Sequence, residues 1–388
     1  MLFIDTAQFN TGSTDTINCL YKAIERVNSS IKKPRNILFA TNNGSLEKIA
    51  GILSDSFPNA NTMGIYTIMY QNGEIKDDHV DLFIFEEDDD YYTVSGLIED
   101  VSSCPVKSIA SIESSIIKIA PGKEDTVCVD FTTGGEEMLI TTLNAAFGNF
   151  HIPLIGGTCN QSHVGMITAV IYNGIIYEDA CIYLLIKNRR GRIKVLTENI
   201  FSKYNDIPHF ATKVDLGKKA LIEVDGKPAA TVLSEEINVP VSQLQDYAMK
   251  YPFARFIGDE NFVIGYHHID ENGTMYNYKQ VNLNDMIYVM HITDYKNKFE
   301  ETIKQIKDSF DSIGFIFSID CINRYNLYKK DDYFDKYTKK WHDNFKYHFG
   351  LVSSGEQYCK QQINQGMVCA IFENAEPTIL SKEDYNGL

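Results

Sequence analysis

An arginine and a glutamate in the last fifth of the chain have the chemistry to bind a charged ligand. Arg324 follows an apolar run at residues 314–319, and Glu356 follows a second apolar run that begins at residue 350. If the runs are neighbouring strands, both side chains could project from one edge of a sheet, where α/β proteins commonly bind ligands. Arginine clamps carboxylates or phosphates through two parallel charge-assisted bonds. The alternative is a structural ion pair of Arg324, for instance with Glu356 itself.

Small residues surround this candidate ligand site. Ser353, Ser354 and Gly355 would leave room for a ligand beside the backbone, and Cys321 lies at the end of the first run. Successive strand residues face opposite sides, so Asp320 would not activate the neighbouring Cys321 thiol as a nucleophile. We therefore predict a buried thiol there and no catalytic residue.

A second stretch combines a strand, a glycine turn and a helix. Residues 126–131 form a buried-type strand, residues 132–136 contain Gly134 and Gly135, and an amphipathic helix follows. The first amides of that helix could hold an anion. The alternative is a tight turn in which Glu136 and Glu137 stabilise the helix dipole.

Composition limits the classes of function. The chain has 388 residues, of which 44% are hydrophobic, enough for real cores. A net charge of -16 argues against nucleic-acid and anionic-membrane partners. The eight cysteines are scattered without zinc or redox spacing, which is typical of thiols in a reducing compartment. No signal peptide or membrane span is visible, so we expect a cytoplasmic protein.

Helical and strand patterns alternate along the chain, which predicts an α/β (α+β) fold. Helical spacing at residues 15–27 and 297–313 predicts two of the helices, and Asn173 with Gly174 predicts the turn of a hairpin. Apolar periodicity lapses in the polar stretch 201–218, which we take as a boundary. We therefore expect two modules, residues 1–205 and 206–388, each with a mixed, largely antiparallel sheet covered by helices.

Several short segments resemble those of the FIST domain proteins, in which N-terminal and C-terminal FIST regions form a sensory module. The segments that carry the resemblance are 153–158, 224–230, 251–252, 320–324, 350–356 and 364–365. The resemblance implies a FIST N-like domain at residues 1–205 and a FIST C-like sensory domain at residues 206–388. It also adds Asn364 to the ligand site.

Arg324 and Glu356 could bind the opposite charges of a zwitterion, so we expect a sensor that binds an amino acid and catalyses no reaction, and the resemblance points to the same ligand. Its signal would pass to a separate partner, such as a histidine kinase, a chemotaxis receptor or a cyclic-dinucleotide enzyme. No cofactor is expected, and no phosphate-binding loop, nucleophile elbow or zinc-protease motif is present in the sequence.

Two other functions stay open. Some FIST relatives are haem sensors, and His267, His342 or His348 could serve as an axial ligand in a haem-dependent gas sensor. The third reading is an adaptor or scaffold without a small ligand.

Overall fold

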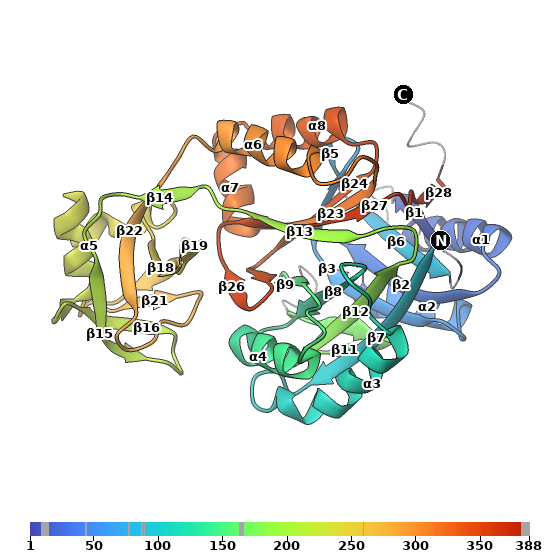
Figure 1. Cartoon of the computed structure of the whole chain (residues 1–388), viewed down its shortest axis with the longest axis horizontal. Coiled ribbons are helices and arrows are strands. Elements are labelled where there is room, and N and C mark those ends of the chain that lie inside the picture. The colour runs from blue at the N-terminus through green and yellow to red at the C-terminus, as the bar shows by residue number, and fades with distance from the viewer. Residues whose placement is uncertain are drawn as a thin grey trace.

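The computed structural model describes residues 1–8, 15–42, 45–76, 78–86, 88, 90–162, 167–258 and 260–381. These residues form four β-sheets packed with helices, which confirms the predicted α/β class. Three sheets surround one apolar centre, with their helices on the outside, and the fourth sheet lies in a separate lobe (Figure 1).

The three central sheets repeat one order of elements. In each unit a first strand and a helix lead to a second strand, a helical crossover leads to a third strand, and a hairpin leads to a last strand. The second and third strands are parallel, and the last strand pairs antiparallel with both the first and the second. The repeated order makes the units topological equivalents.

The elements of the units are as follows. Unit 1 contains β1 (Leu2–Gln8), α1 (Asp15–Ser30), β2 (Pro34–Thr41), α2 (Leu46–Ser56), β3 (Asn61–Tyr66), β4 (Ile68–Gln71), β5 (Glu74–Lys76) and β6 (His79–Glu86). Unit 2 contains β7 (Tyr91–Glu99), η1 (Pro105–Ser108), α3 (Ile109–Ile119), β8 (Thr126–Thr132), α4 (Glu136–Phe147), β9 (Leu154–Thr158), β10 (Val170–Tyr172), β11 (Ile175–Tyr177) and β12 (Ala180–Asn188). Unit 3 contains β13 (Ile193–Glu198), α6 (Tyr295–Lys307), β23 (Ile313–Cys321), α7 (Ile322–Lys330), α8 (Phe334–Asn344), β24 (His348–Ser353), β25 (Glu356–Tyr358), β26 (Gln361–Ile363) and β27 (Met367–Glu373), and β28 (Thr378–Ile379) then pairs with β1.

The hairpins connect the units in a ring. Strand β4 of unit 1 pairs with β24 of unit 3, β10 of unit 2 pairs with β3 of unit 1, and β25 of unit 3 pairs with β9 of unit 2. Each unit thus completes the sheet of another. Separating any one unit would break main-chain hydrogen bonds in two sheets.

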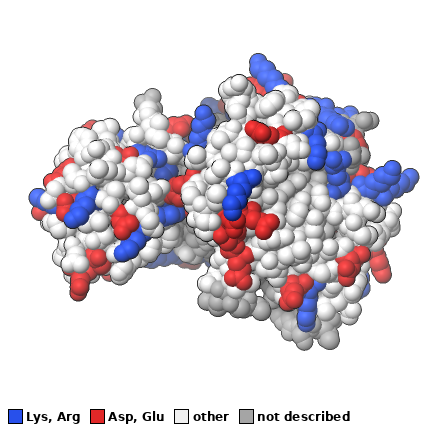
Figure 2. All heavy atoms as spheres, turned by 90° about the horizontal axis from the view of Figure 1, so that it is seen from below, with Lys and Arg blue, Asp and Glu red and all other residues white. Residues whose placement is uncertain are grey.

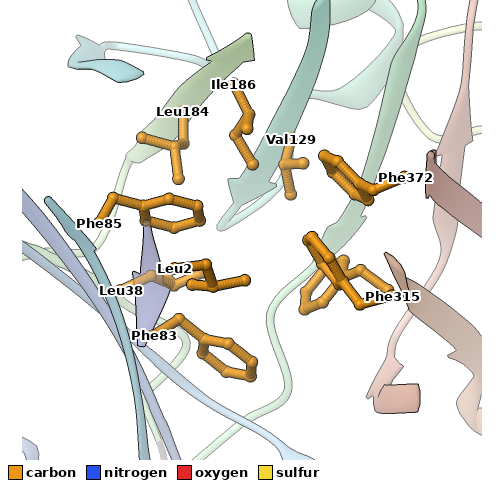
Figure 3. Close-up of a pocket in the computed structure, with 10 residues that line it drawn as sticks. Leu2, Leu38, Phe83, Phe85, Val129, Leu184, Ile186, Phe315 and Phe372 are labelled. Atoms are coloured by element: carbon orange, nitrogen blue, oxygen red, sulfur yellow. The ribbon is translucent and has the colours of Figure 1, made fainter. Parts of the chain in front are cut away.

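Apolar side chains from all three sheets meet at the centre of the ring. Figure 3 shows Leu2 and Phe83 of unit 1 facing Val129 of unit 2 and Phe315 and Phe372 of unit 3. The rings of Phe315 and Phe372 stack with centroids 4.0 Å apart. The remaining void is only about 20 Å³ and is lined by apolar residues, so it is a packing gap and not a ligand site.

The fourth sheet is inserted between β13 and α6 of unit 3 and forms the left-hand lobe of Figure 1. Its elements are β14 (Phe201–Lys203), β15 (His209–Asp215), β16 (Ala220–Val224), β17 (Lys227–Pro228), α5 (Ala229–Ile237), η2 (Val241–Tyr247), β18 (Phe253–Ile257), β19 (Glu260–Val263), β20 (Tyr266–Ile269), β21 (Met275–Asn277) and β22 (Met286–Ile292). We call this the inserted lobe. Its strands pair antiparallel, and it has its own apolar core.

Several local expectations can be compared with these elements. The first predicted helix is α1, and the predicted hairpin is β10–β11, with Asn173 and Gly174 at φ 51° and 80° in its turn. The helix expected at 297–313 is α6, which ends earlier, at Lys307, and β23 begins at Ile313. The stretch expected to form an irregular boundary contains β14 and β15. The domain division at 205 and 206 stays a prediction.

Candidate functional site

The two apolar runs that flank the expected site are neighbouring strands. Strands β23 and β24 pair in parallel, with Cys321 opposite Ser353 at their carboxyl ends. Arg324 follows in the first turn of α7, and Glu356 begins β25. The expected arrangement of the backbone is therefore confirmed.

Arg324 lies inside the protein, in an ion-pair network. Its side chain is fully buried, its Nη2 donates to Glu198 Oε1, and its Nε lies 2.9 Å from Asp320 Oδ1. The guanidinium also lies 4.9 Å from the ring centroid of Tyr328 and 5.4 Å from that of Tyr337. Its ion-pair partners are thus Glu198 and Asp320, and the structural role left open by the sequence accounts for both contacts.

Asp320 connects this network to the hairpin of unit 1. Its carboxylate accepts hydrogen bonds from the hydroxyls of Tyr70 and Tyr337. Burial raises the pKa of Asp320 to about 6, although Arg324 and the two tyrosines act in the opposite direction. Because Tyr70 lies on β4 and Asp320 on β23, the network joins units 1 and 3.

Glu356 is also buried, but its surroundings differ from those of Arg324. It is fully buried, and Ser353 Oγ donates to its Oε1 at 2.9 Å. Burial raises the pKa of Glu356 well above its usual value, which favours the protonated, neutral form. Burial and then Glu356 raise the pKa of the Cys321 thiol, so this cysteine is a poor nucleophile.

Of the other predicted residues, only Asn364 is shown to contact the inserted lobe in the described part of the chain. The Ser354 hydroxyl is exposed and donates to Asn160 Oδ1 at 2.7 Å. Gly355 has φ 148°, and a Cβ there would lie 3.4 Å from Asn364 Oδ1. Asn364 Nδ2 donates to the carbonyl of Ile264 in the inserted lobe at 3.1 Å. None of these three residues contacts Arg324 in the hydrogen bonds and ion pairs of the described residues, so the predicted set does not form one site around that arginine.

Side chains of the three central units, which together form the second lobe, make polar contacts with the inserted lobe at the junction between the two. Lys219 Nζ of the inserted lobe lies 2.9 Å from Glu136 Oε2 and 3.3 Å from Glu137 Oε2 of α4. Thr158 Oγ1 donates to Glu136 Oε1, and the backbone amide of Gln280 donates to Glu137 Oε1 at 2.8 Å. Burial lowers the pKa of Lys219, but the two glutamates outweigh it and raise the pKa overall. The start of α4, which the sequence offered as an anion site, is thus occupied by its own glutamates and this lysine.

A pocket of about 190 Å³ lies beside these contacts, between α4, the β25–β26 hairpin and the inserted lobe. Figure 2 shows the two lobes joined at a narrow waist, with acidic and basic side chains on both sides of it. The pocket is lined by Glu137, Ile140, Thr141, Arg255, Lys279, Gln280, Asn282, Lys360, Gln361 and Gln362. Most of these side chains are polar, and three of them are cationic.

Sequence reasoning missed Lys219, Arg255 and Lys279 because no local pattern marks them. Each lies in or beside a different strand of the inserted lobe, and their common surroundings come from the packing of that lobe on units 2 and 3. The one available signal was Glu136 with Glu137 after a glycine turn.

The three histidines considered for haem lie on three different elements, β20, α8 and β24. His348 is buried, its ring stacks on Trp341 with centroids 4.0 Å apart, and its Nε2 lies 2.9 Å from Ser318 Oγ. Burial lowers the pKa of His348 well below its usual value. His267 lies on β20 beside the Tyr278 ring, and His342 lies in α8. His348 is buried and its Nε2 already pairs with Ser318 Oγ, so this nitrogen is not open to a haem iron.

Within the described residues, no group of three or more His, Cys, Asp and Glu side chains is arranged to hold a metal ion. Across the same part of the chain, no helix has the length and apolar character needed to cross a membrane.

Comparison with known families gives a match over part of the chain. Residues 36–227 match the FIST N domain. This is a sensory domain of signalling proteins, so the FIST N part of the resemblance is confirmed. The match runs from β2 through unit 2 and into the inserted lobe, whereas no FIST C-terminal model matches the rest of the chain.

The other comparisons are less informative. The comparison with curated protein sequences finds no significant match. Among solved structures, the chain is similar to cyanuric acid hydrolase from A. caulinodans, with 6% sequence identity, a TM-score of 0.38, and coverage of 96% of this chain and 99% of that chain.

Proposed function

We propose that this chain is a cytoplasmic sensory protein that binds an amino acid between its two lobes and signals through a separate partner. The FIST N match supports the sensory role. The observation that carries the binding role is the pocket at the junction between the three central units and the inserted lobe, which is lined by cations and a carboxylate. Two chain segments connect the lobe to unit 3. Ligand pockets occur preferentially at such domain interfaces.

A ligand at this junction would change how the lobes pack. The contacts across it include ion pairs and hydrogen bonds of individual side chains and an apolar cluster that Phe201, Ala254 and Met290 share with unit 3, whereas the three units share continuous sheets. A molecule that contacts both lobes would stabilise one relative position, and a partner that recognises that position would receive the signal. The resemblance to FIST proteins gives a histidine kinase, a chemotaxis receptor or a cyclic-dinucleotide enzyme as the partner.

The buried groups support a binding role over a catalytic one. Burial keeps protons on the Cys321 thiol and favours the neutral Glu356 carboxyl, so neither is prepared to attack or to accept a proton. All eight cysteines are free thiols, which fits a reducing cytoplasm.

A thermal-shift screen with the twenty standard amino acids tests the proposal. An amino acid present at a hundred times its dissociation constant should stabilise the folded chain by about 2.7 kcal/mol and raise the melting temperature. If none of them raises the melting temperature while added haem gives a Soret band, the amino-acid sensor is wrong and the haem sensor replaces it.

A further inference from the structure

We propose that the pocket between α4, the β25–β26 hairpin and the inserted lobe binds the amino acid as a zwitterion. Arg255 and Lys279 would bind its carboxylate, and Glu137 would bind its ammonium group. This inference rests on the proposed function and deepens it, because it assigns the ligand to residues outside the site that the sequence indicates.

Two cations converge on a single neutral oxygen in this pocket. Arg255 Nη2 lies 2.9 Å and Lys279 Nζ 3.3 Å from Gln361 Oε1. Lys279 also donates to the Gln362 carbonyl, and its side chain is almost completely buried. Two positive charges that share one amide oxygen repel each other unless an anion binds between them. The arrangement is therefore suited to a carboxylate.

The cations retain capacity for such an anion. Asp285 Oδ2 lies 3.2 Å from Arg255 Nη1, but the buried Arg255 Nε has no hydrogen-bond partner among the described residues. In that same part of the chain, Lys279 forms no ion pair with a carboxylate. An unpaired donor on a buried cation costs free energy that a bound carboxylate would recover. Lys360 adds an exposed third charge at the rim.

The opposite wall offers a carboxylate. Glu137 lines the pocket. It accepts a hydrogen bond from the backbone amide of Gln280 at 2.8 Å, and its Oε2 lies 3.3 Å from Lys219 Nζ. A carboxylate has about four acceptor positions, so Glu137 can accept an ammonium group as well. A ligand with a carboxylate and an ammonium group would therefore contact both lobes at once, since Arg255 and Lys279 belong to the inserted lobe and Glu137 to the core.

Lys279 also makes binding dependent on pH. Burial, and then the nearby Arg255, lower its pKa to about 7, while Glu137 and Asp285 act in the opposite direction and Lys219 adds to the lowering. A bound carboxylate favours the charged amine, so binding takes up a proton where Lys279 is neutral in the free protein. Affinity should fall above pH 7 by up to about tenfold per pH unit.

The test is calorimetry with each amino acid that raises the melting temperature, and with its amide and its des-amino acid. Lys279→Met and Glu137→Gln should each weaken binding at least about tenfold, and Lys279→Met should also abolish the pH dependence above pH 7. Lys360→Glu changes an exposed residue and should weaken binding without affecting the fold. Lys250→Met, an exposed lysine of the same lobe, is the matched control.

Two failures can be distinguished. If no amino acid binds the unaltered chain, the proposed function itself is wrong. If an amino acid binds, but Lys279→Met, Glu137→Gln and Lys360→Glu bind it as tightly as Lys250→Met, the function stands and this pocket is not its site. Equal affinity for the amino acid and its des-amino acid would overturn the role of Glu137 alone.

Discussion

The central ring and the inserted lobe are held in different ways. In the ring, every unit completes the sheet of another, and the side chains of all three meet at an apolar centre. The inserted lobe has its own core and its own sheet, and it contacts units 2 and 3 through ion pairs, single hydrogen bonds and an apolar cluster shared with unit 3. Continuous main-chain pairing resists local opening, whereas contacts made by side chains alone open more easily. The ring is therefore suited to act as a rigid frame, and the lobe as the element that responds to a ligand.

The largest expected effect is a loss of folding stability of the ring. Arg324→Met removes the cation between Glu198 and Asp320 and leaves two buried carboxylates without their charge partner. Removing one partner of a buried ion pair costs about 3–5 kcal/mol of folding stability, so the variant should unfold at a much lower denaturant concentration. Urea unfolding followed by circular dichroism measures the loss.

A triple variant provides the control for this network. Arg324→Met combined with Glu198→Gln and Asp320→Asn removes all three charges and should recover most of the lost stability. If Arg324→Met alone keeps parental stability but loses binding of an amino acid, Arg324 is a ligand residue, as the sequence first indicated.

The second prediction concerns the pairing of the β4–β5 hairpin of unit 1 with the sheet of unit 3. A Cβ at Gly350 of β24 would lie 1.9 Å from the ring of Tyr70 on β4, so a larger side chain must displace that ring. Gly350→Val should destabilise the ring by about 1–3 kcal/mol, since overpacking of a core has this cost. Chemical denaturation gives the value. Gly51→Ala in α2, where nothing lies within 4 Å, should be neutral or stabilising, and an equal loss in both variants would contradict the explanation.

Local elements could be predicted from the sequence because their signals are local. The Asn173 and Gly174 turn and the helical spacing of α1 each lie within a short window. The ring could not be predicted in this way, because its partners are distant. Tyr70 contacts Ser318 across 248 positions, and no periodicity within either strand encodes that pairing. The repeated order of the units becomes visible only once the strands are paired.

The candidate site shows the same limit. The adjacency of β23 and β24 was predictable from two apolar runs separated by helical sequence. The partner of Arg324 was not, because Glu198 lies 126 positions away on β13. Lys279 gave no signal, since a lysine in sequence is expected to be exposed, and only the packing of the lobe against Gln361 and Gln362 buries it.

The smallest expected effect separates the lobe from the ring without unfolding either. Lys219→Met removes the charge that Glu136 and Glu137 share across the junction, and the buried Glu136 then loses its cation. Lys219 is partly exposed, so we expect a cost of about 1–2 kcal/mol in docking of the lobe and little change in global stability. The backbone amide of Gln280, which donates to Glu137, should then exchange its hydrogen roughly 5–30-fold faster.

Hydrogen exchange by mass spectrometry measures this change. The Cys321 amide, which donates to the Gly366 carbonyl inside unit 3, should keep its protection, and Lys218→Met on the neighbouring exposed lysine should leave both amides unchanged. A bound amino acid should restore protection at Gln280 if it bridges the lobes. Equal acceleration at Gln280 and Cys321 would mean that lobe and ring unfold as one body, and the contrast between a rigid frame and a responsive lobe would be wrong.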